Sequence, residues 1–300
     1  MKRLLPLFLC LLLLLSGCGS SSGQEDEAAL HIVATTYPVY LFANSIVGDT
    51  EGVEVTQLIT QEVSCLHDYT LTVTDMKAIE KADVIILSGA GLEDFMADAL
   101  AQSNAAVIDC SAGAELLPAS GHEHHDAGED GDAGHYDPHF WMTEDGALSM
   151  MNSICDGLSA LDEPHAAAYA ANRNEAASLL PVDPLDGSTL SCPYLITFHD
   201  GFQYFAQANG LTLLKAIEEE EGSEASAAEI KEIVSLIKEY HIPAIFTEKS
   251  GSDATAQAIA RETGVAVYQL DMIMSGSGQD VSAYVDAMNS NYAVIREALS

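Results

Sequence analysis

Short apolar runs alternate with helix-compatible segments along most of the chain, and this alternation is the feature that most constrains the fold. The runs that predict strands lie at 31–35, 53–59, 83–87 and 106–109 in the first half and at 195–198, 212–216, 244–247 and 265–270 in the second. Strands joined through helices by short connections pair in parallel. The chain is therefore predicted to form an α/β fold of two lobes, each with a mostly parallel sheet flanked by helices.

A long helix-compatible stretch separates the two halves. It covers 144–180, is rich in Ala and Leu, and has Pro164 as its only interruption. Apolar residues recur in it at helical spacing, which predicts one buried face. We expect one long, rigid helix that joins the lobes and limits their relative movement. The predicted divisions are a signal peptide at 1–17, a tether at 18–29, an N-terminal lobe at 30–142, the connecting helix at 143–180 and a C-terminal lobe at 181–300.

The first residues are typical of a targeting signal. Lys2 and Arg3 precede an apolar run at 4–15, which is too short to span a bilayer. The sequence Leu-Ser-Gly-Cys that ends at Cys18 resembles the bacterial lipobox, whose Cys becomes the lipidated first residue of the mature chain. The small, polar and acidic residues that follow are typical of a flexible tether. We therefore expect a lipoprotein anchored in the cell membrane and exposed on its outer side.

The charge of the chain is strongly negative, with 11 basic and 46 acidic residues and a formal net charge of −35. Cleavage before Cys18 would remove Lys2 and Arg3, leaving 9 basic residues against 46 acidic ones, or −37. Nucleic acid is excluded as a partner because phosphate binding needs basic patches. Such acidity attracts cations over long range, although it is also explained as a solubility trait.

Four cysteines remain after the predicted lipid site, and they allow three disulfide pairings. None of them has the Cys-x-x-Cys spacing of a metal site. Cys65 and Cys110 both follow predicted strands of the first half, so a bridge between these two is the pairing to which we lean. Buried free thiols are an equally good alternative.

The segment 118–137 interrupts the alternation and has no apolar periodicity. Acidic residues and glycines in it surround four histidines, His122, His124, His125 and His135. Such a composition predicts a loop, and it suits weak collection of metal ions. A solvated loop with incidental histidines is the alternative.

Three other histidines each lie where a predicted strand meets a loop. His67 follows the strand at 53–59, His139 lies in Asp-Pro-His-Phe-Trp, and His199 follows the strand at 195–198. Ligands in α/β folds bind beyond the carboxyl ends of strands, so these side chains are expected to meet in one cleft. Three imidazoles favour zinc over other ions.

Zinc needs a fourth ligand, and the best candidate is Asp271, directly after the strand at 265–270. Glu248, after the strand at 244–247, is the second choice, with a role as hydrogen-bond acceptor as its alternative. Zinc-bound imidazoles also need partners for their second nitrogen. The carboxylates near the histidines that could serve, or could simply stabilise turns, are Asp68, Asp137 and Asp200.

Several motifs together resemble a known family, the zinc members of the manganese/zinc/iron class of ABC-importer substrate-binding lipoproteins. The motifs are Thr35-Thr36-Tyr37-Pro38, His67-Asp68-Tyr69-Thr70-Leu71 with Asp75, Ala82-Asp83-Val84-Ile85, the His-rich loop, Asp137-Pro138-His139-Phe140-Trp141, Phe198-His199-Asp200-Gly201-Phe202-Gln203-Tyr204-Phe205 and Tyr268-Gln269-Leu270-Asp271. The resemblance covers nearly the whole mature chain. It implies two lobes of the periplasmic-binding-protein type with a helical backbone, and metal held between them by His67, His139, His199 and Asp271.

The chain departs from the family pattern beside two of the expected ligands. Leu66 and Met272 stand where relatives often have proline, which leaves the geometry of the Asp271 loop open, and a thiolate from Cys65 is a minor alternative ligand. Manganese-binding relatives typically have Glu in place of His199, so zinc is expected here. Zinc ligation needs neutral imidazoles, so binding should weaken below roughly pH 6.

The resemblance implies a monomeric receptor that captures Zn²⁺ and delivers it to an ABC permease. A site of four protein ligands leaves no coordination position for an activated water, which argues against an enzyme. Three alternatives remain open: a manganese or iron receptor, a zinc hydrolase with Glu248 as general base, and a surface adhesin. The affinity and the identity of the permease do not follow from the sequence.

Overall fold

The computed structural model describes residues 30–61, 66, 69–119, 136–181, 185–216, 225–250 and 252–300. The predicted signal peptide, the lipid site Cys18 and the tether lie outside these residues, as do Cys65, His67, Asp68 and the four histidines of the His-rich loop. No helix in the described part is long and apolar enough to cross a membrane.

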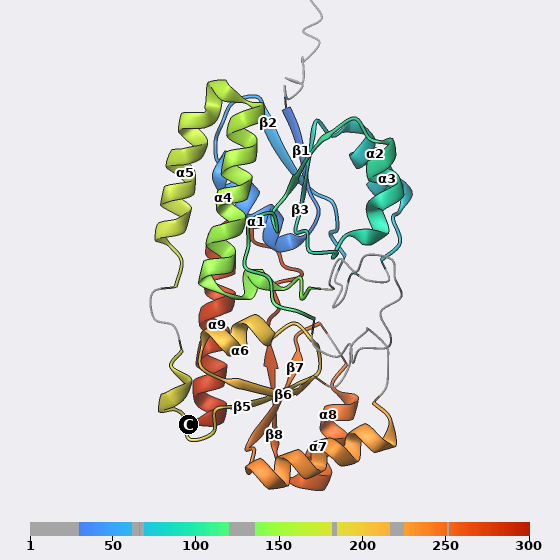
Figure 1. Cartoon of the computed structure of the whole chain (residues 1–300), viewed down its shortest axis with the longest axis vertical. Helices are drawn as coiled ribbons and strands as arrows, with labels where there is room; N and C mark the ends of the chain where they lie inside the picture. The colour runs from blue at the N-terminus through green and yellow to red at the C-terminus, as the bar shows by residue number, and fades with distance from the viewer. Residues whose placement is uncertain are drawn as a thin grey trace, which may run out of the picture.

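The prediction of two α/β lobes with parallel sheets is confirmed (Figure 1). The strands are β1 (Leu30–Ala34), β2 (Val53–Gln57), β3 (Val84–Leu87), β4 (Ala106–Asp109), β5 (Tyr194–Thr197), β6 (Thr212–Ala216), β7 (Ala244–Glu248) and β8 (Ala266–Leu270). They form two parallel sheets with the same strand order, β2-β1-β3-β4 and β6-β5-β7-β8. The strand order changes direction between β1 and β3 in one sheet and between β5 and β7 in the other. A ligand site is expected at the carboxyl ends of these strands.

Nine α-helices lie in the described part of the chain. They are α1 (Tyr37–Val47), α2 (Val73–Lys81), α3 (Ala97–Gln102), α4 (Glu144–Leu161), α5 (Ala166–Ser178), α6 (Gln203–Ala208), α7 (Ala227–Tyr240), α8 (Ala254–Thr263) and α9 (Val281–Leu299). Short 3₁₀ turns are η1 (Asp94–Met96), η2 (Phe140–Met142), η3 (Glu163–His165) and η4 (Gly187–Thr189). Helix α2 begins at Val73, directly after Thr72, which forms a capping box with Asp75.

The predicted single helix over 143–180 is wrong, because the chain reverses direction in the middle of that stretch. Helix α4 ends at Leu161, Asp162 has non-helical dihedrals, and Pro164 lies in a 3₁₀ turn before α5. Proline has no amide hydrogen and breaks a helix interior. The helices α4 and α5 pack side by side beside the N-terminal sheet (Figure 1).

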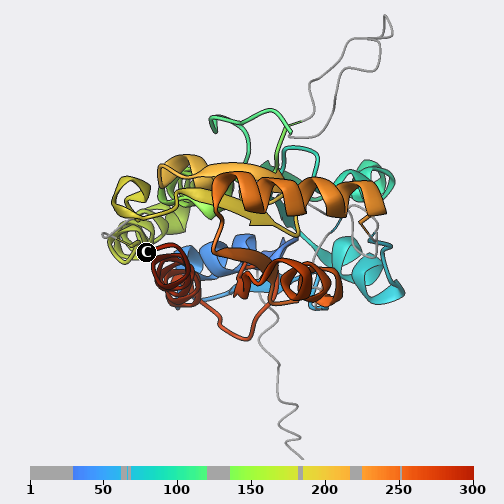
Figure 2. The ribbon, with the colours of Figure 1, turned by 90° about the horizontal axis from the view of Figure 1, so that it is seen from below.

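Helix α9 contacts both lobes. It packs on β8 of the C-terminal sheet and on α1 of the N-terminal lobe. Figure 1 shows α9 running along the long axis of the molecule, and Figure 2 shows it nearly end-on beside the C-terminus. The last helix of the chain thus takes the joining role that the sequence had assigned to 143–180.

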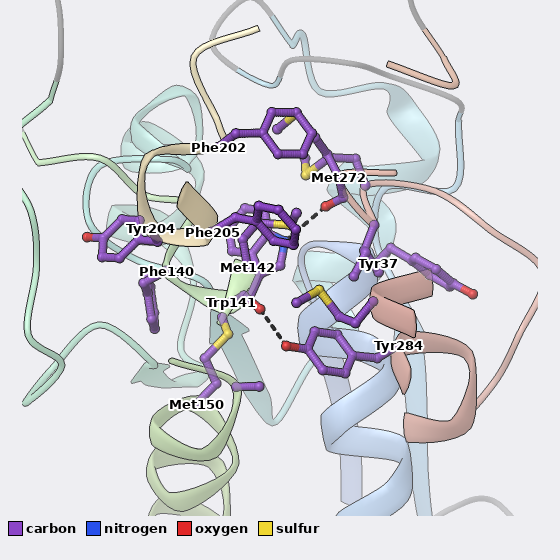
Figure 3. Close-up of a cluster of buried hydrophobic side chains, with 14 of the residues drawn as sticks. Tyr37, Phe140, Trp141, Met142, Met150, Phe202, Tyr204, Phe205, Met272 and Tyr284 are labelled. Atoms are coloured by element: carbon purple, nitrogen blue, oxygen red, sulfur yellow. Dashed lines mark hydrogen bonds between the residues drawn. The ribbon is translucent and has the colours of Figure 1, made fainter. Parts of the chain in front are cut away.

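An aromatic and methionine cluster fills the space where the lobes meet (Figure 3). Trp141 at its centre is fully buried. The Trp141 indole N–H donates to the Met272 carbonyl at 3.0 Å, and the Tyr284 hydroxyl donates to the Trp141 carbonyl at 2.8 Å. These bonds connect η2, the loop after β8 and helix α9.

The cysteines in the described part are free. Cys110, Cys155 and Cys192 are all buried thiols. The favoured bridge from Cys65 to Cys110 is therefore wrong for this structure, and the alternative of buried thiols holds for these three. Burial raises the pKa of the Cys110 thiol well above its usual value, with the Glu93 and Asp109 carboxylates adding to the effect. The Cys110 thiol is protonated and packs as a small apolar side chain.

Candidate metal site

His139 lies in the segment that leads into α4, and its ring orientation is set by Asp137. One Asp137 carboxylate oxygen accepts from the His139 backbone N–H at 2.9 Å and lies 2.8 Å from the ring Nδ1. Both side chains are buried. A carboxylate only accepts hydrogen bonds, so this contact favours the neutral tautomer in which Nδ1 carries the proton and Nε2 has the lone pair.

His199 follows β5 and is held in the same manner by a carboxylate from the next strand. Its Nδ1 lies 3.0 Å from Oε1 of Glu248, the last residue of β7, and both side chains are buried. The Thr197 hydroxyl donates to the His199 carbonyl at 2.8 Å and fixes the turn after β5. His199 therefore also presents Nε2, the nitrogen that can bind a metal.

The two imidazoles meet between the lobes. Their ring centroids are 5.4 Å apart and the rings are perpendicular. The indole of Trp141 lies 5.2 Å from the His139 ring and closes that side of the pair. Gly201 leaves the room that this approach needs, because a Cβ there would be 3.1 Å from the His139 ring and 2.2 Å from the methyl of Met272.

Two buried carboxylates lie behind the two imidazoles, and no Lys or Arg of the described part of the chain forms an ion pair with either of them. Asp137 is 3% exposed and Glu248 is 6% exposed. The second oxygen of Asp137 has no hydrogen-bond partner in the described part of the chain. Buried negative charge is costly unless a positive charge compensates it. A cation bound to the two Nε2 atoms would supply that compensation.

Asp271 directly follows β8, and helix α9 fixes its backbone. Its N–H donates to the Asn291 side-chain oxygen at 2.8 Å, and the Asn291 amide donates to its carbonyl at 2.7 Å. One oxygen of the Asp271 carboxylate accepts from the Ile273 N–H at 2.8 Å. The other is 2.9 Å from the ammonium of Lys249. Asp271 is thus held by donors on both of its oxygens.

The loop that begins at Asp271 lies against the imidazole pair, since the next residue, Met272, contacts the same space as His139. Ile273 in this loop has a φ of +62° and is 1% exposed. A β-branched residue rarely adopts the left-handed region, and backbone strain of this kind gathers at functional sites. The bonds from Trp141 and Asn291 hold the loop in this conformation.

The structure brings His139 and His199 together and places the Asp271 loop beside them, while His67 and Asp68 lie outside the described residues. Within the described residues no group of three His, Cys, Asp or Glu side chains is arranged to hold a metal. Asp137 and Glu248 each contact a ring nitrogen of a histidine. Of the two roles considered for Glu248, zinc ligand or hydrogen-bond acceptor, this contact fits the acceptor.

Sequence reasoning missed two residues of this region. Lys249 pairs with Asp271, and Asn291 holds the backbone of Asp271. The position of Lys249 directly after Glu248, at a strand end, was a visible signal. Nothing in the sequence indicated Asn291, which reaches the loop from the middle of α9.

Comparison with known proteins gives one consistent family. The family model described as zinc-uptake complex component A, periplasmic (ZnuA), matches residues 32–298. The zinc-binding lipoprotein AdcA of Streptococcus pneumoniae is 28% identical over 96% of this chain, which spans only 59% of that protein. The high-affinity zinc uptake system protein ZnuA of Bacillus subtilis is 29% identical, with 96% of this chain and 94% of that protein covered. The crystal structure of the Zn(II)-bound ZnuA-like domain of pneumococcal AdcA has a TM-score of 0.72 at 26% identity, covering 90% of this chain and 98% of that one.

Proposed function

Since the chain belongs to the family of the periplasmic zinc-uptake component ZnuA, we propose that it is the extracytoplasmic zinc receptor of an ABC importer. It captures Zn²⁺ between its lobes and delivers the ion to a membrane permease. The observation that carries this function is the meeting of His139 and His199, each with Nδ1 on a buried carboxylate and Nε2 free. Zinc is cargo here, so the protein performs no chemical step.

The proposed ligands are His67, His139, His199 and Asp271 in tetrahedral geometry. Asp137 and Glu248 hold two of the imidazoles in the tautomer that binds metal. Four protein ligands leave no position for an activated water, and Glu248 is already bonded to His199 rather than available as a general base. Both points agree with the non-enzymatic role of the family.

Zinc is the proposed cargo because imidazole suits it, whereas manganese sites use more oxygen ligands. Any ion that competes with zinc would have to bind the two imidazoles of His139 and His199, which Asp137 and Glu248 hold in place. The proposed receptor is a monomer held on the outer side of the membrane by a lipid on Cys18. The His-rich loop at 118–137 is proposed to collect zinc weakly before the main site binds it.

The test is metal binding under defined conditions. Purified protein stripped of metal is titrated with Zn²⁺ and Mn²⁺ against a chromophoric chelator, together with His139→Ala, His199→Ala and the control His31→Ala. His31 is 40% exposed at its side chain and is 3.7 Å from Glu54, far along β1 from the cleft. We expect one tight zinc ion per wild-type and His31→Ala chain, and at least a hundredfold loss in the other two variants. Equal zinc binding in all four proteins would refute the proposed site.

A further inference from the structure

Lys249 lies at the proposed site without having any role in the binding of a cation. Its ammonium is 2.9 Å from the carboxylate of Asp271 and its side chain is 50% exposed, while that of Asp271 is 21% exposed. We propose that Lys249 is an internal competitor for zinc, which occupies the Asp271 carboxylate in the empty receptor and reclaims it during release. This inference rests on the proposed function and assigns a regulatory residue to the same site.

The position of Lys249 links it to both proposed ligands of the C-terminal lobe. Glu248 orients His199, and Lys249, the next residue, pairs with Asp271. The Lys249 N–H donates to the Leu270 carbonyl at 3.1 Å and extends the β7–β8 ladder past the last strand residue. The backbone that carries the lysine is therefore fixed directly beside the backbone that carries the aspartate.

The carboxylate, rather than its loop, is the part that can change partners. The bonds to Asn291 hold the backbone of Asp271 on both sides, and Trp141 holds the carbonyl of Met272. The lysine has four rotatable bonds and a half-exposed head, so it can leave at small cost. Exchange then consists of breaking the Nζ–H···Oδ2 contact and forming a metal–oxygen bond, with no proton or electron transferred.

The charges determine the direction of the effect. An ammonium repels a divalent cation and attracts the carboxylate that the cation needs, so the lysine weakens zinc binding in either position. The attraction is that of a partly exposed ion pair and is therefore modest. When zinc leaves, the ammonium returns to Oδ2 and opposes recapture of the ion. The receptor thus gives up some affinity and gains faster release.

The test compares Lys249→Met with Lys249→Arg and with Lys215→Met. Lys215 is the matched control, because it forms a similar half-exposed pair with Glu232 at 3.3 Å between β6 and α7. We expect Lys249→Met to bind zinc about three- to tenfold more tightly and to release it correspondingly more slowly to a chelator in stopped flow. Lys249→Arg restores wild-type behaviour, and Lys215→Met changes neither constant.

A double-mutant cycle separates competition from a general structural effect. In the Asp271→Asn background the substitution Lys249→Met has no carboxylate to release and removes only the repulsion between the ammonium and the cation, so its effects on zinc affinity and release rate should be much smaller than in the wild-type background. The inference is overturned if Lys249→Met binds zinc as the wild type does or more weakly, or if its effect is as large in the Asp271→Asn background as in the wild-type background. Failure of the wild type itself to bind zinc would instead refute the proposed function.

Discussion

At the scale of single residues, two carboxylates decide which nitrogen each histidine offers. Asp137 and Glu248 are buried, and each lies within 3.0 Å of a ring Nδ1. Partners of this kind fix ring orientation and raise the basicity of the ligand nitrogen. The sequence places Asp137 two residues before its histidine, but Glu248 is 49 positions from His199, because they meet only through the pairing of β5 with β7.

The substitution Glu248→Gln tests this role. An amide can donate to Nδ1 and leave the proton on Nε2, so zinc affinity should fall by about tenfold or more. Chelator competition measures the loss, and Glu232→Gln provides the same change at an exposed surface pair. An unchanged affinity in Glu248→Gln would mean that the contact with His199 has no part in metal binding.

Glu93 is another buried carboxyl, located at the carboxyl ends of the N-terminal strands. It accepts from the Thr35 hydroxyl at 2.6 Å and from the backbone N–H groups of Ser88 and Gly89. Burial raises its pKa from 4.5 to about 7, although these hydrogen bonds act in the opposite direction. The carboxyl therefore keeps its proton to a higher pH in the folded chain than in the unfolded one.

The sign of the resulting pH dependence follows from linkage. Between pH 4.5 and 7 the folded state binds more protons at Glu93, so its contribution to the free energy of unfolding decreases as pH rises through that window. The total decrease is roughly 3 kcal/mol. Glu93→Gln lacks this component, so urea unfolding should show that the stability of the wild type relative to the variant decreases by about this amount as pH rises from 4.5 to 7. A pH-independent difference between the two proteins would contradict the raised pKa.

At the scale of elements, the loop before α9 is tied to α1. The Tyr37 hydroxyl accepts from the Gly278 N–H at 2.9 Å and donates to the Gly278 carbonyl at 3.3 Å. Asn44 donates to the Gln279 carbonyl at 2.6 Å. Gly276 has to be glycine, because a Cβ there would lie 2.5 Å from the Tyr37 hydroxyl. These contacts join the lobes along one edge.

The substitution Tyr37→Phe removes both hydroxyl bonds and leaves the backbone of Gly278 without its partner. We expect about 1–3 kcal/mol lower stability and faster hydrogen exchange in the loop before α9. Tyr40→Phe is the control, since it removes the same hydroxyl from a tyrosine of α1 that is only half buried. Equal exchange in the two variants would show that Tyr37 does not tie the lobes.

Periodicity predicted most elements well, because apolar runs and helical spacing are local properties. The bounds of β4 and β6 agree with prediction at both ends. The break between α4 and α5 at Pro164 was not predicted, because the residues on both sides of this proline have high helix propensity. Contacts between distant segments, such as Lys249 with Asp271 and Asn291 with its backbone, depend on strand order and helix docking, which no local pattern records.

At the scale of the whole molecule, two lobes with the same strand order face each other across a buried aromatic cluster, with α9 contacting both. The proposed site lies where the carboxyl ends of strands and the segment before α4 converge. Contacts of α9, η2 and the loop after β8 join the two lobes in place of one connecting helix.

The net charge of −35 acts over the whole surface and should attract Zn²⁺ before it reaches the site. The association rate constant, measured by stopped flow at fixed free zinc, is therefore expected to fall as ionic strength rises. The dissociation rate constant should change much less, because it depends on contacts inside the cleft. An association rate that does not respond to salt would show that the acidity serves solubility alone.

The most direct test of the central claim is anomalous diffraction at the zinc edge from crystals of the zinc-loaded protein. One strong peak is predicted between the lobes, at about 2.0–2.2 Å from Nε2 of His139 and His199, with His67 and Asp271 completing the coordination. A peak elsewhere, or imidazoles bound to separate ions, would contradict a single zinc site held between the two lobes.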